Sequence, residues 1–256
     1  HKAPHRNWMP ALRHLSLYDD IEIPEPPTLF DDWKDNAPGA RVQELEIDRH
    51  MDLNYDLFVD LTPDFNQPPS QKRQDRSAWA NMKRMTPDQI KRWRDHYAPR
   101  DKAFHDAKLT GKELVRWKFQ RYAKNYLRCV RGVDESVGRL QKELIKLGLD
   151  SNTIVIYSSD QGFYIGDHGW YDKRWMYEES FKMPFVVQCP GVIEPGTVSD
   201  HMAMNIDFGP TLLDMAGLEV PSTMQGKSFK SAFEQDNDPG RTAVYYHYYE
   251  YPIWHK

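Results

Sequence analysis

A short stretch of the chain carries side chains that could bind a metal ion and an anion. Asp160 and Gln161 offer a carboxylate and an amide oxygen, and hard cations such as Ca²⁺ and Mg²⁺ prefer oxygen ligands. A few residues later, Lys173 stands between Asp172 and Arg174. A lysine can hold an anion as a point charge, whereas an arginine binds it through a planar fork of donors. The stretch could therefore bind a cation and an anionic substrate.

Each of these patterns also has a purely structural interpretation. Asp160-Gln161-Gly162 is typical of a turn that leaves a strand, and a lysine between an acid and an arginine is common on solvated surfaces. His168 could be a hydrogen-bonded loop histidine or a donor to a substrate. His5 could act as a general acid if the fold brings it beside Lys173. Spacing alone does not choose between these interpretations.

The elements around this stretch predict an α/β fold. A continuous β-branched run, Thr153–Ser158, ends just before Asp160, and a second run covers Pro184–Cys189. Runs without alternation are expected for parallel strands buried on both faces. Because ligands in open α/β sheets lie beyond the carboxyl ends of strands, Asp160 is expected at that edge. Helices are predicted over residues 40–60, 87–97, 110–147, 176–181 and 205–216, and a final strand over 242–251.

Two of these helices begin with a capping box, in which a threonine and a residue three positions later cap each other's backbone. The boxes begin at Thr86 and Thr110. Pro99 is expected to stop the first helix, and Gly148 to close the second as a left-handed cap. Apolar residues of the second helix recur every three or four positions from Tyr122 onward, which predicts a helix that covers a sheet.

Composition argues against several classes of protein. The net charge of −4 comes without a polybasic block, so nothing points to nucleic acid as a partner. No apolar run approaches the roughly 18 residues of a membrane span. Cys129 and Cys189 lack the spacing of a metal site and are expected to be buried thiols rather than a disulfide. The chain has neither an initiator Met nor a targeting signal, and we expect a fragment rather than a processed protein.

Several motifs together resemble the type I, formylglycine-dependent sulfatases. Ser159–Trp170, with Lys173 beyond, is similar to the distal signature of that family, and Lys2-Ala3-Pro4-His5 is similar to its mid-chain histidine motif. The Asp-Lys-Arg at 172–174 resembles members that act like N-acetylglucosamine-6-sulfatase. Further family motifs follow in the same order at Met183–Phe185, Pro190-Gly191, Asp207–Asp214 and Met224–Phe229.

The resemblance implies a fold and a set of roles. The expected fold is a three-layer α/β alkaline-phosphatase-like fold with a mainly parallel sheet, incomplete at the N-terminus and at the C-terminus. Residues 1–217 would be the distal part of the catalytic domain, and 218–256 the start of a C-terminal extension. Asp160 and Gln161 would bind Ca²⁺, in preference to Mg²⁺. Lys173 would hold the sulfate, and His5 would protonate the leaving hydroxyl. His168, Asp172 and Arg174 would contact the sugar.

The chain departs from the family in what it lacks. The nucleophile motif Cys/Ser-x-Pro/Ala-x-Arg, whose Cys or Ser becomes formylglycine, is absent from the sequence, as is the N-terminal Asp-Asp metal pair. We therefore expect formylglycine in a missing N-terminal part, and no activity from this chain alone. The alternatives are a phosphatase, phosphonate hydrolase or phosphodiesterase of the same superfamily, or a sulfatase-like fragment that binds glycans without turnover.

The resemblance also predicts the partner and the compartment. The expected partner is a sulfated saccharide, most simply a 6-O-sulfated amino sugar. Family members of this kind work in the periplasm, outside the cell or in lysosomes. The oligomeric state does not follow from the sequence.

Overall fold

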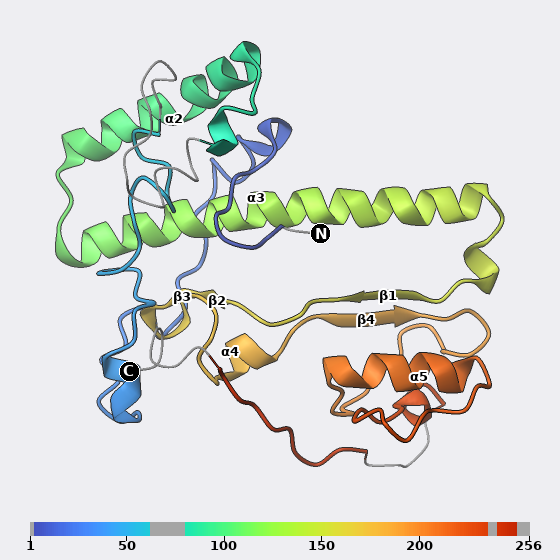
Figure 1. Ribbon diagram of the computed structural model, residues 1–256. Helices are drawn as coiled ribbons and strands as arrows, with labels where there is room; N and C mark the ends of the chain where they lie inside the picture. Colours follow the sequence, from blue (N-terminus) through green and yellow to red (C-terminus); the bar gives the residue numbers. More distant parts are fainter. Residues whose placement is uncertain (1–2, 62–79, 235–239, 250–256) are drawn as a thin grey trace. The chain divides into compact units, whose positions relative to one another are not determined.

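The structure is a computed structural model that describes residues 3–61, 80–234 and 240–249 (Figure 1). The chain divides into two compact units. Unit 1 contains His1–Leu140 and Phe163–Lys173, and unit 2 contains Gln141–Gly162 and Arg174–Glu250. The stretch that carries the candidate chemistry is thus shared between them, and each unit is described by itself.

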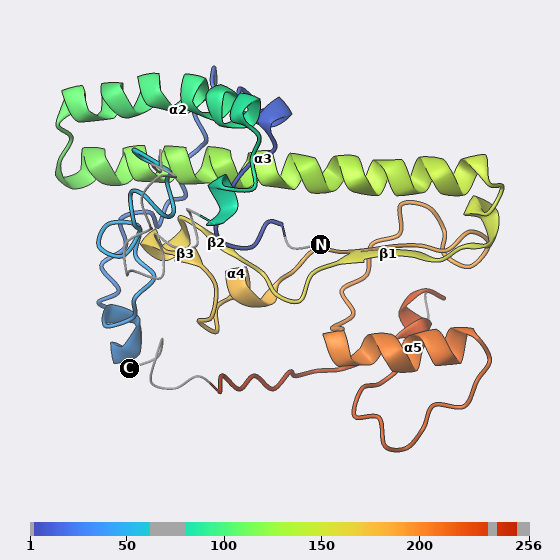
Figure 2. The same ribbon diagram turned by 45° about the horizontal axis from the view of Figure 1, so that its top comes forward.

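Two long helices form the frame of unit 1. Helix α2, Pro87–Ala107, and helix α3, Gly111–Lys146, lie side by side in both views (Figures 1 and 2). The capping box at Thr86 is confirmed, because its hydroxyl accepts from the Gln89 amide and the Gln89 side chain accepts from the Thr86 amide.

The prediction that Pro99 ends α2 is wrong, since the helix continues through it to Ala107. A proline inside a helix removes one backbone hydrogen bond. Contacts with α3 beyond the proline offset that loss: Phe104 stacks on Trp117 at 4.0 Å between ring centroids, and Asp101 pairs with Arg121. Tertiary packing therefore outweighs the local helix breaker.

Helix α3 ends as predicted. Gly148 has a φ of +68°, and the Leu149 amide donates to the Leu144 carbonyl over 3.0 Å, which satisfies a carbonyl of the last turn. The apolar stripe predicted for this helix is buried only in its first part. Tyr122 and Val133 are buried, whereas Leu140 and Leu147 are more than half exposed.

Residues 40–60 do not form the predicted helix. They contain a 3-10 turn, η2 at Pro38–Arg41, and irregular turns. The Ile47 amide donates to the Gly169 carbonyl, and the Tyr171 amide donates to the Leu45 carbonyl, each over 2.9 Å. Backbone groups that a helix would pair internally are thus hydrogen-bonded to residues 169–171, far away in the sequence.

The core of unit 1 is aromatic and encloses a small hairpin. Strand β2, Tyr164–Ile165, pairs antiparallel with strand β3, Tyr171–Asp172. Trp8 is fully buried, with its ring centroid 4.5 Å from that of Tyr122 and 6.3 Å from that of Tyr171. Edge and tilted contacts of this kind stabilise buried rings beyond their area alone. They pack the N-terminal segment against the hairpin.

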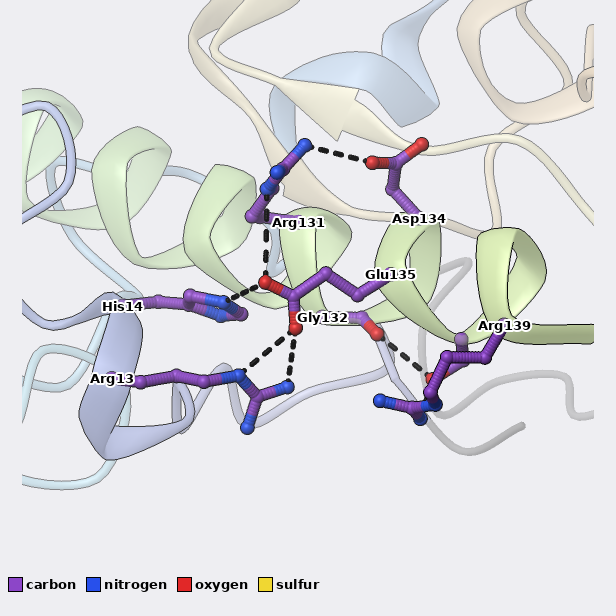
Figure 3. Close-up of polar contacts among 8 residues, drawn as sticks. Arg13, His14, Arg131, Gly132, Asp134, Glu135 and Arg139 are labelled. Carbon is purple, nitrogen blue, oxygen red and sulfur yellow. Dashed lines mark hydrogen bonds and ion pairs between the residues drawn. The ribbon is translucent and has the colours of Figure 1, made fainter. Parts of the chain in front are cut away.

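A second contact fastens the N-terminal segment to α3 (Figure 3). Oε2 of Glu135 accepts two hydrogen bonds from the Arg13 guanidinium, over 2.9 and 2.5 Å. Its Oε1 lies 2.7 Å from Nε2 of the His14 ring. These hydrogen bonds, with Arg13 first, lower the pKa of Glu135 to about 2. The 3-10 turn η1, Leu12–His14, is thereby held on the helix.

Unit 2 contains both predicted apolar strands. Strand β1, Val155–Ser158, and strand β4, Phe185–Gln188, match the runs found in the sequence, but they pair antiparallel, with Val155 opposite Gln188. The parallel expectation for this pair is wrong. Helix α4, Glu178–Phe181, lies between these strands in the sequence and has a single turn. Neither strand is buried on both faces.

The rest of unit 2 packs around phenylalanines. Helix α5, Phe208–Met215, follows the 3-10 turn η5, Asn205–Asp207, and Gly217 at φ +70° follows it, as predicted. Phe185 stacks on Phe208, with ring centroids 5.3 Å apart. Further 3-10 turns are η3 at Asp150–Asn152, η4 at Asp167–Gly169 in unit 1, and η6 at Lys230–Ala232.

The sequence also predicted a final strand and two buried thiols. Residues 242–249 contain a bend and no strand, so the predicted final strand is wrong there, and 250–251 lie outside the described residues. Cys129 and Cys189 are free and buried, as expected, and burial raises the pKa of Cys129 to about 12. Among the described residues, no helix has the length and apolar character that crossing a bilayer requires.

Candidate active site

The predicted site residues are divided between the two units. His5, His168, Asp172 and Lys173 belong to unit 1, whereas Asp160, Gln161 and Arg174 belong to unit 2.

Lys173 is a buried cation at the end of the hairpin. Its side chain is 9% exposed, and its Nζ lies 3.4 Å from Oδ1 of Asp172, whose side chain is 1% exposed. The ammonium also lies 5.7 Å from the centre of the Phe163 ring. Burying an ammonium is costly unless it is paired, so this pair is more than a solvated surface cluster. A buried lysine with one carboxylate beside it can hold an anion.

His5 lies on the surface of unit 1, one residue before a well-anchored segment. Its Nδ1 is 2.6 Å from the carbonyl oxygen of Arg6. A carbonyl can only accept, so Nδ1 carries a proton, and Nε2 is the ring nitrogen left for a substrate. When protonated, His5 would thus offer Nε2–H as an acid.

Arg6 and Asp56 are residues that the sequence reasoning missed. Arg6 donates from Nε and Nη2 to the two carboxylate oxygens of Asp56, over 2.6 and 2.8 Å. Burial raises the pKa of Asp56, although the Arg6 charge acts to lower it. No spacing signal links residues fifty positions apart, so only the folded chain reveals this pair.

His168 fits the structural interpretation well. Its Nδ1 lies 3.1 Å from Oδ2 of Asp31, and its backbone amide donates to the Thr28 hydroxyl over 2.9 Å. Its φ of +56° is left-handed, between Gly166 and Gly169, which are left-handed too. At Gly166 an added Cβ would lie 2.7 Å from the Phe119 ring, so only glycine fits. These contacts hold the loop that joins β2 and β3.

In unit 2, Asp160 and Gln161 follow β1 as predicted. Asp160 is exposed, and its Oδ1 accepts a hydrogen bond from the Ser159 hydroxyl over 3.2 Å. Its backbone carbonyl accepts from the side-chain amide of Asn205 over 3.0 Å. Gly162 donates to the Ser180 carbonyl, and a Cβ there would lie 2.1 Å from the Glu179 carbonyl oxygen. The turn is therefore fixed by a backbone contact that only glycine allows.

The donor set of this turn suits a hard cation in kind but not in number. A carboxylate and an amide oxygen are typical Ca²⁺ ligands, yet Ca²⁺ takes six to eight oxygens. Within the described ranges, no three His, Cys, Asp or Glu side chains gather closely enough to hold a metal ion. Asp160 and Gln161 can therefore supply only part of a coordination shell.

Arg174 is held in unit 2 by its backbone. Its amide donates to the Ser180 hydroxyl over 3.3 Å, and its carbonyl accepts from the Tyr246 hydroxyl over 2.6 Å. Its φ of +120° is unusual for an arginine.

Comparison with known proteins points to one family. Residues 166–256 match the family model described as N-sulphoglucosamine sulphohydrolase, C-terminal. The chain is 44% identical to an N-acetylglucosamine-6-O-sulfatase of Bacteroides thetaiotaomicron over 99% of its own length and 45% of that protein. It is also 42% identical to the human N-acetylglucosamine-6-sulfatase, over 38% of the chain and 18% of that enzyme.

A solved structure gives the same result for the fold. With a TM-score of 0.89 and 42% identity, the chain resembles a protein determined in complex with its substrate, D-glucosamine-2-N,6-O-disulfate. The match covers 99% of this chain and 51% of that one, so the chain spans about half the length of these relatives. The expected alkaline-phosphatase-like fold is that of these sulfatases. Along almost its whole length the chain is similar to sulfatases.

Proposed function

We propose that this chain forms part of the active site of a longer enzyme that hydrolyses a sulfate ester on a glycan, a 6-O-sulfated amino sugar. The observation that carries the proposal is the buried Lys173 ammonium beside Asp172, at the end of a hairpin. A sulfate group is an anion without a proton to give up, and a fixed cation suits it. The likeness to N-acetylglucosamine-6-sulfatases along the chain supports the choice of substrate.

The residues of unit 1 divide the work of the reaction. Lys173 binds the sulfate and neutralises the charge that develops as the ester bond breaks. His5, with Nδ1–H bonded to a carbonyl, gives its Nε2 proton to the departing sugar oxygen. A sugar alkoxide is a poor leaving group, so this proton matters more for the hydrolysis of a sugar sulfate than of an aryl sulfate. Asp172 would contact the sugar, and His168 would hold the loop between β2 and β3.

In unit 2, Asp160 and Gln161 would hold a Ca²⁺ ion together with oxygen ligands from elsewhere in the enzyme. When bound, the ion would offset the negative charge of the sulfate. Arg174 would bind neighbouring sugar hydroxyls. The formylglycine nucleophile would also come from outside this chain, because the sequence has no motif for it. We therefore expect the 256-residue chain alone to release no sulfate.

The division of the chain and its compartment are further parts of the proposal. We expect residues 1–217 to belong to the catalytic domain and 218–256 to begin a C-terminal extension. The resemblance to glycan sulfatases favours a compartment outside the cytoplasm, either the periplasm, the extracellular space or the lysosome.

The test is sulfate release by the whole enzyme from N-acetylglucosamine-6-sulfate, followed by ion chromatography. Lys173→Met should lower kcat/KM by about 100-fold or more, the usual effect of removing one group that stabilises charge in the transition state. The control is Lys118→Met. Lys118 is another buried lysine of unit 1, but its Nζ donates to the Ile47 and Asp48 carbonyls. It should affect stability and leave kcat/KM within a fewfold of wild type.

Two results would contradict the proposal. One is equal loss of activity in the two lysine variants, which would make Lys173 a structural cation. The other is faster hydrolysis of the corresponding 6-phosphate than of the 6-sulfate, which would favour the phosphatase alternative.

A further inference from the structure

The guanidinium of Arg6 joins three segments of unit 1 that are far apart in the sequence. It forms a two-point ion pair with Asp56, whose side chain is completely buried. It also lies 5.2 Å from the ring centres of both Tyr55 and Tyr171. Contacts of a guanidinium with aromatic faces are attractive, and they are stronger where water is excluded. Tyr171 directly precedes Asp172 and Lys173 in the chain.

The partner of Arg6 is itself fixed. Oδ2 of Asp56 accepts a second hydrogen bond, from the Asp52 amide over 2.9 Å. Next to Arg6, the side-chain amide of Asn7 donates to the Tyr55 carbonyl over 3.0 Å. The buried Trp8 then packs on Tyr171. Arg6 is therefore the first residue in a run of three anchored ones.

His5 lies just outside this anchor and depends on it. Its backbone is joined to Arg6, and its ring is oriented by the Arg6 carbonyl. The ring is exposed, so packing does not orient it. The position of the His5 acid relative to the Lys173 segment is thus set mainly through Arg6, which contacts Tyr171 on that segment.

We propose that Arg6 is a positioning residue for catalysis, which through Asp56 and Tyr171 holds His5 in the geometry needed to protonate the leaving sugar oxygen. The inference rests on the proposed function, in which His5 is the acid. It adds a residue that touches neither the sulfate nor the sugar. Arg6 acts through His5, so its loss should resemble the loss of the acid rather than the loss of the sulfate site.

The experiment is a double-mutant cycle in the whole enzyme. Arg6→Gln, Arg6→Lys and His5→Ala are made singly, and each Arg6 variant is also combined with His5→Ala. Activity is measured on N-acetylglucosamine-6-sulfate and on 4-nitrophenyl sulfate, whose phenolate leaves without acid help. Arg6→Lys keeps the charge but loses the fork, so it serves if Arg6→Gln does not fold.

The expected result differs between the two substrates. Arg6→Gln should lower kcat on the sugar sulfate by up to about 100-fold, because small misplacements of a catalytic group have effects of that size. Arg6→Lys should give a kcat between those of wild type and Arg6→Gln. On the aryl sulfate both should stay within about threefold, by the general-acid argument. In the His5→Ala background, the Arg6 changes should cause no further loss.

The matched control is Arg121→Gln. Arg121 also donates to a buried aspartate, Asp101, and lies 4.2 Å from the centre of the Tyr97 ring. It donates to the Leu57 carbonyl as well, but within the described part of the chain no hydrogen bond or ion pair joins it to His5, Arg6 or Asn7. Arg121→Gln should lower kcat on the two substrates by equal factors. Its effect on the activation free energy should add to that of His5→Ala. The same behaviour from the Arg6 variants would overturn the inference while leaving His5 as the acid. A harmless His5→Ala would instead overturn the proposed role of His5, and the inference with it.

Discussion

The carboxylate of Asp101 on α2 lies 2.9 Å from the guanidinium of Arg121 on α3, and both side chains are more than nine-tenths buried. Asp101 also accepts the Asp60 amide over 3.0 Å. Removing one member of such a pair leaves a buried charge without compensation. The pair therefore ties the half of α2 that follows Pro99 to its neighbour.

The first prediction concerns the stability of this tie. Asp101→Asn should lower the free energy of unfolding by about 3–5 kcal/mol, the usual effect of breaking a buried ion pair. Asp106→Asn is the control. Its pair with Lys102, at 2.5 Å, is largely exposed, so the loss should be below about 1 kcal/mol. Urea unfolding of the two variants measures the difference, and equal losses would contradict the prediction.

The second prediction concerns the turn after β1. Gly162→Ala puts a methyl group against the Glu179 carbonyl, so the backbone must move. We expect the free energy of unfolding to fall by about 1–3 kcal/mol. Half-maximal activity should need a higher Ca²⁺ concentration, because Asp160 and Gln161 share the turn. Gly138→Ala on α3 meets nothing within 4 Å and should instead stabilise by about 0.5–1 kcal/mol. Thermal unfolding and Ca²⁺ titration of activity test both variants, and an unchanged Gly162→Ala enzyme would refute the close contact.

The third prediction is a pH dependence from His96. Burial, followed by the charges of Arg100 and Arg128, lowers the pKa of His96 to about 4. Below pH 6.5 the unfolded chain binds a proton that the folded chain takes up only near pH 4. The free energy of unfolding should therefore fall as the pH drops from 6.5 to 4.

His96→Gln should remove part of that fall. The check is the urea midpoint of both proteins at pH 4.5 to 8.5. Their difference should be constant above pH 7.5, where the histidine is neutral in either state, and should shift in favour of the variant as the pH falls below 6.5. Parallel curves over the whole range would contradict the assignment.

The fourth prediction concerns the choice of substrate. Arg174→Ala should lower kcat/KM on N-acetylglucosamine-6-sulfate. The corresponding loss of transition-state binding should be about 1.5–3 kcal/mol, the range for hydrogen bonds from charged groups. A small aryl sulfate has no sugar hydroxyls and should lose much less. Lys182→Ala, at an exposed residue of the same unit, is the control and should change neither. Equal losses on both substrates would remove the specificity role.

Sequence signals predicted helix caps and strands correctly where neighbouring residues decide the structure. The capping box at Thr86 and the left-handed cap at Gly148 were both predicted, since each depends on residues within one or two turns. The two β-branched runs also form strands. The motif residues Asp160, Lys173 and His5 pointed to sulfatase-like chemistry, and the comparisons agree on the family.

Tertiary structure decided what depends on contacts between distant residues. Helix α2 passes Pro99 because α3 supplies Trp117 and Arg121 as partners. The two apolar strands pair antiparallel, a direction that their composition did not indicate. Arg6 finds Asp56 fifty residues away, and no pattern in the sequence marks that pair. The sequence by itself therefore determined these caps and strands and the resemblance to sulfatases. Which side chains hold one another was decided by packing, because a buried charge is stable only where the fold brings it a partner.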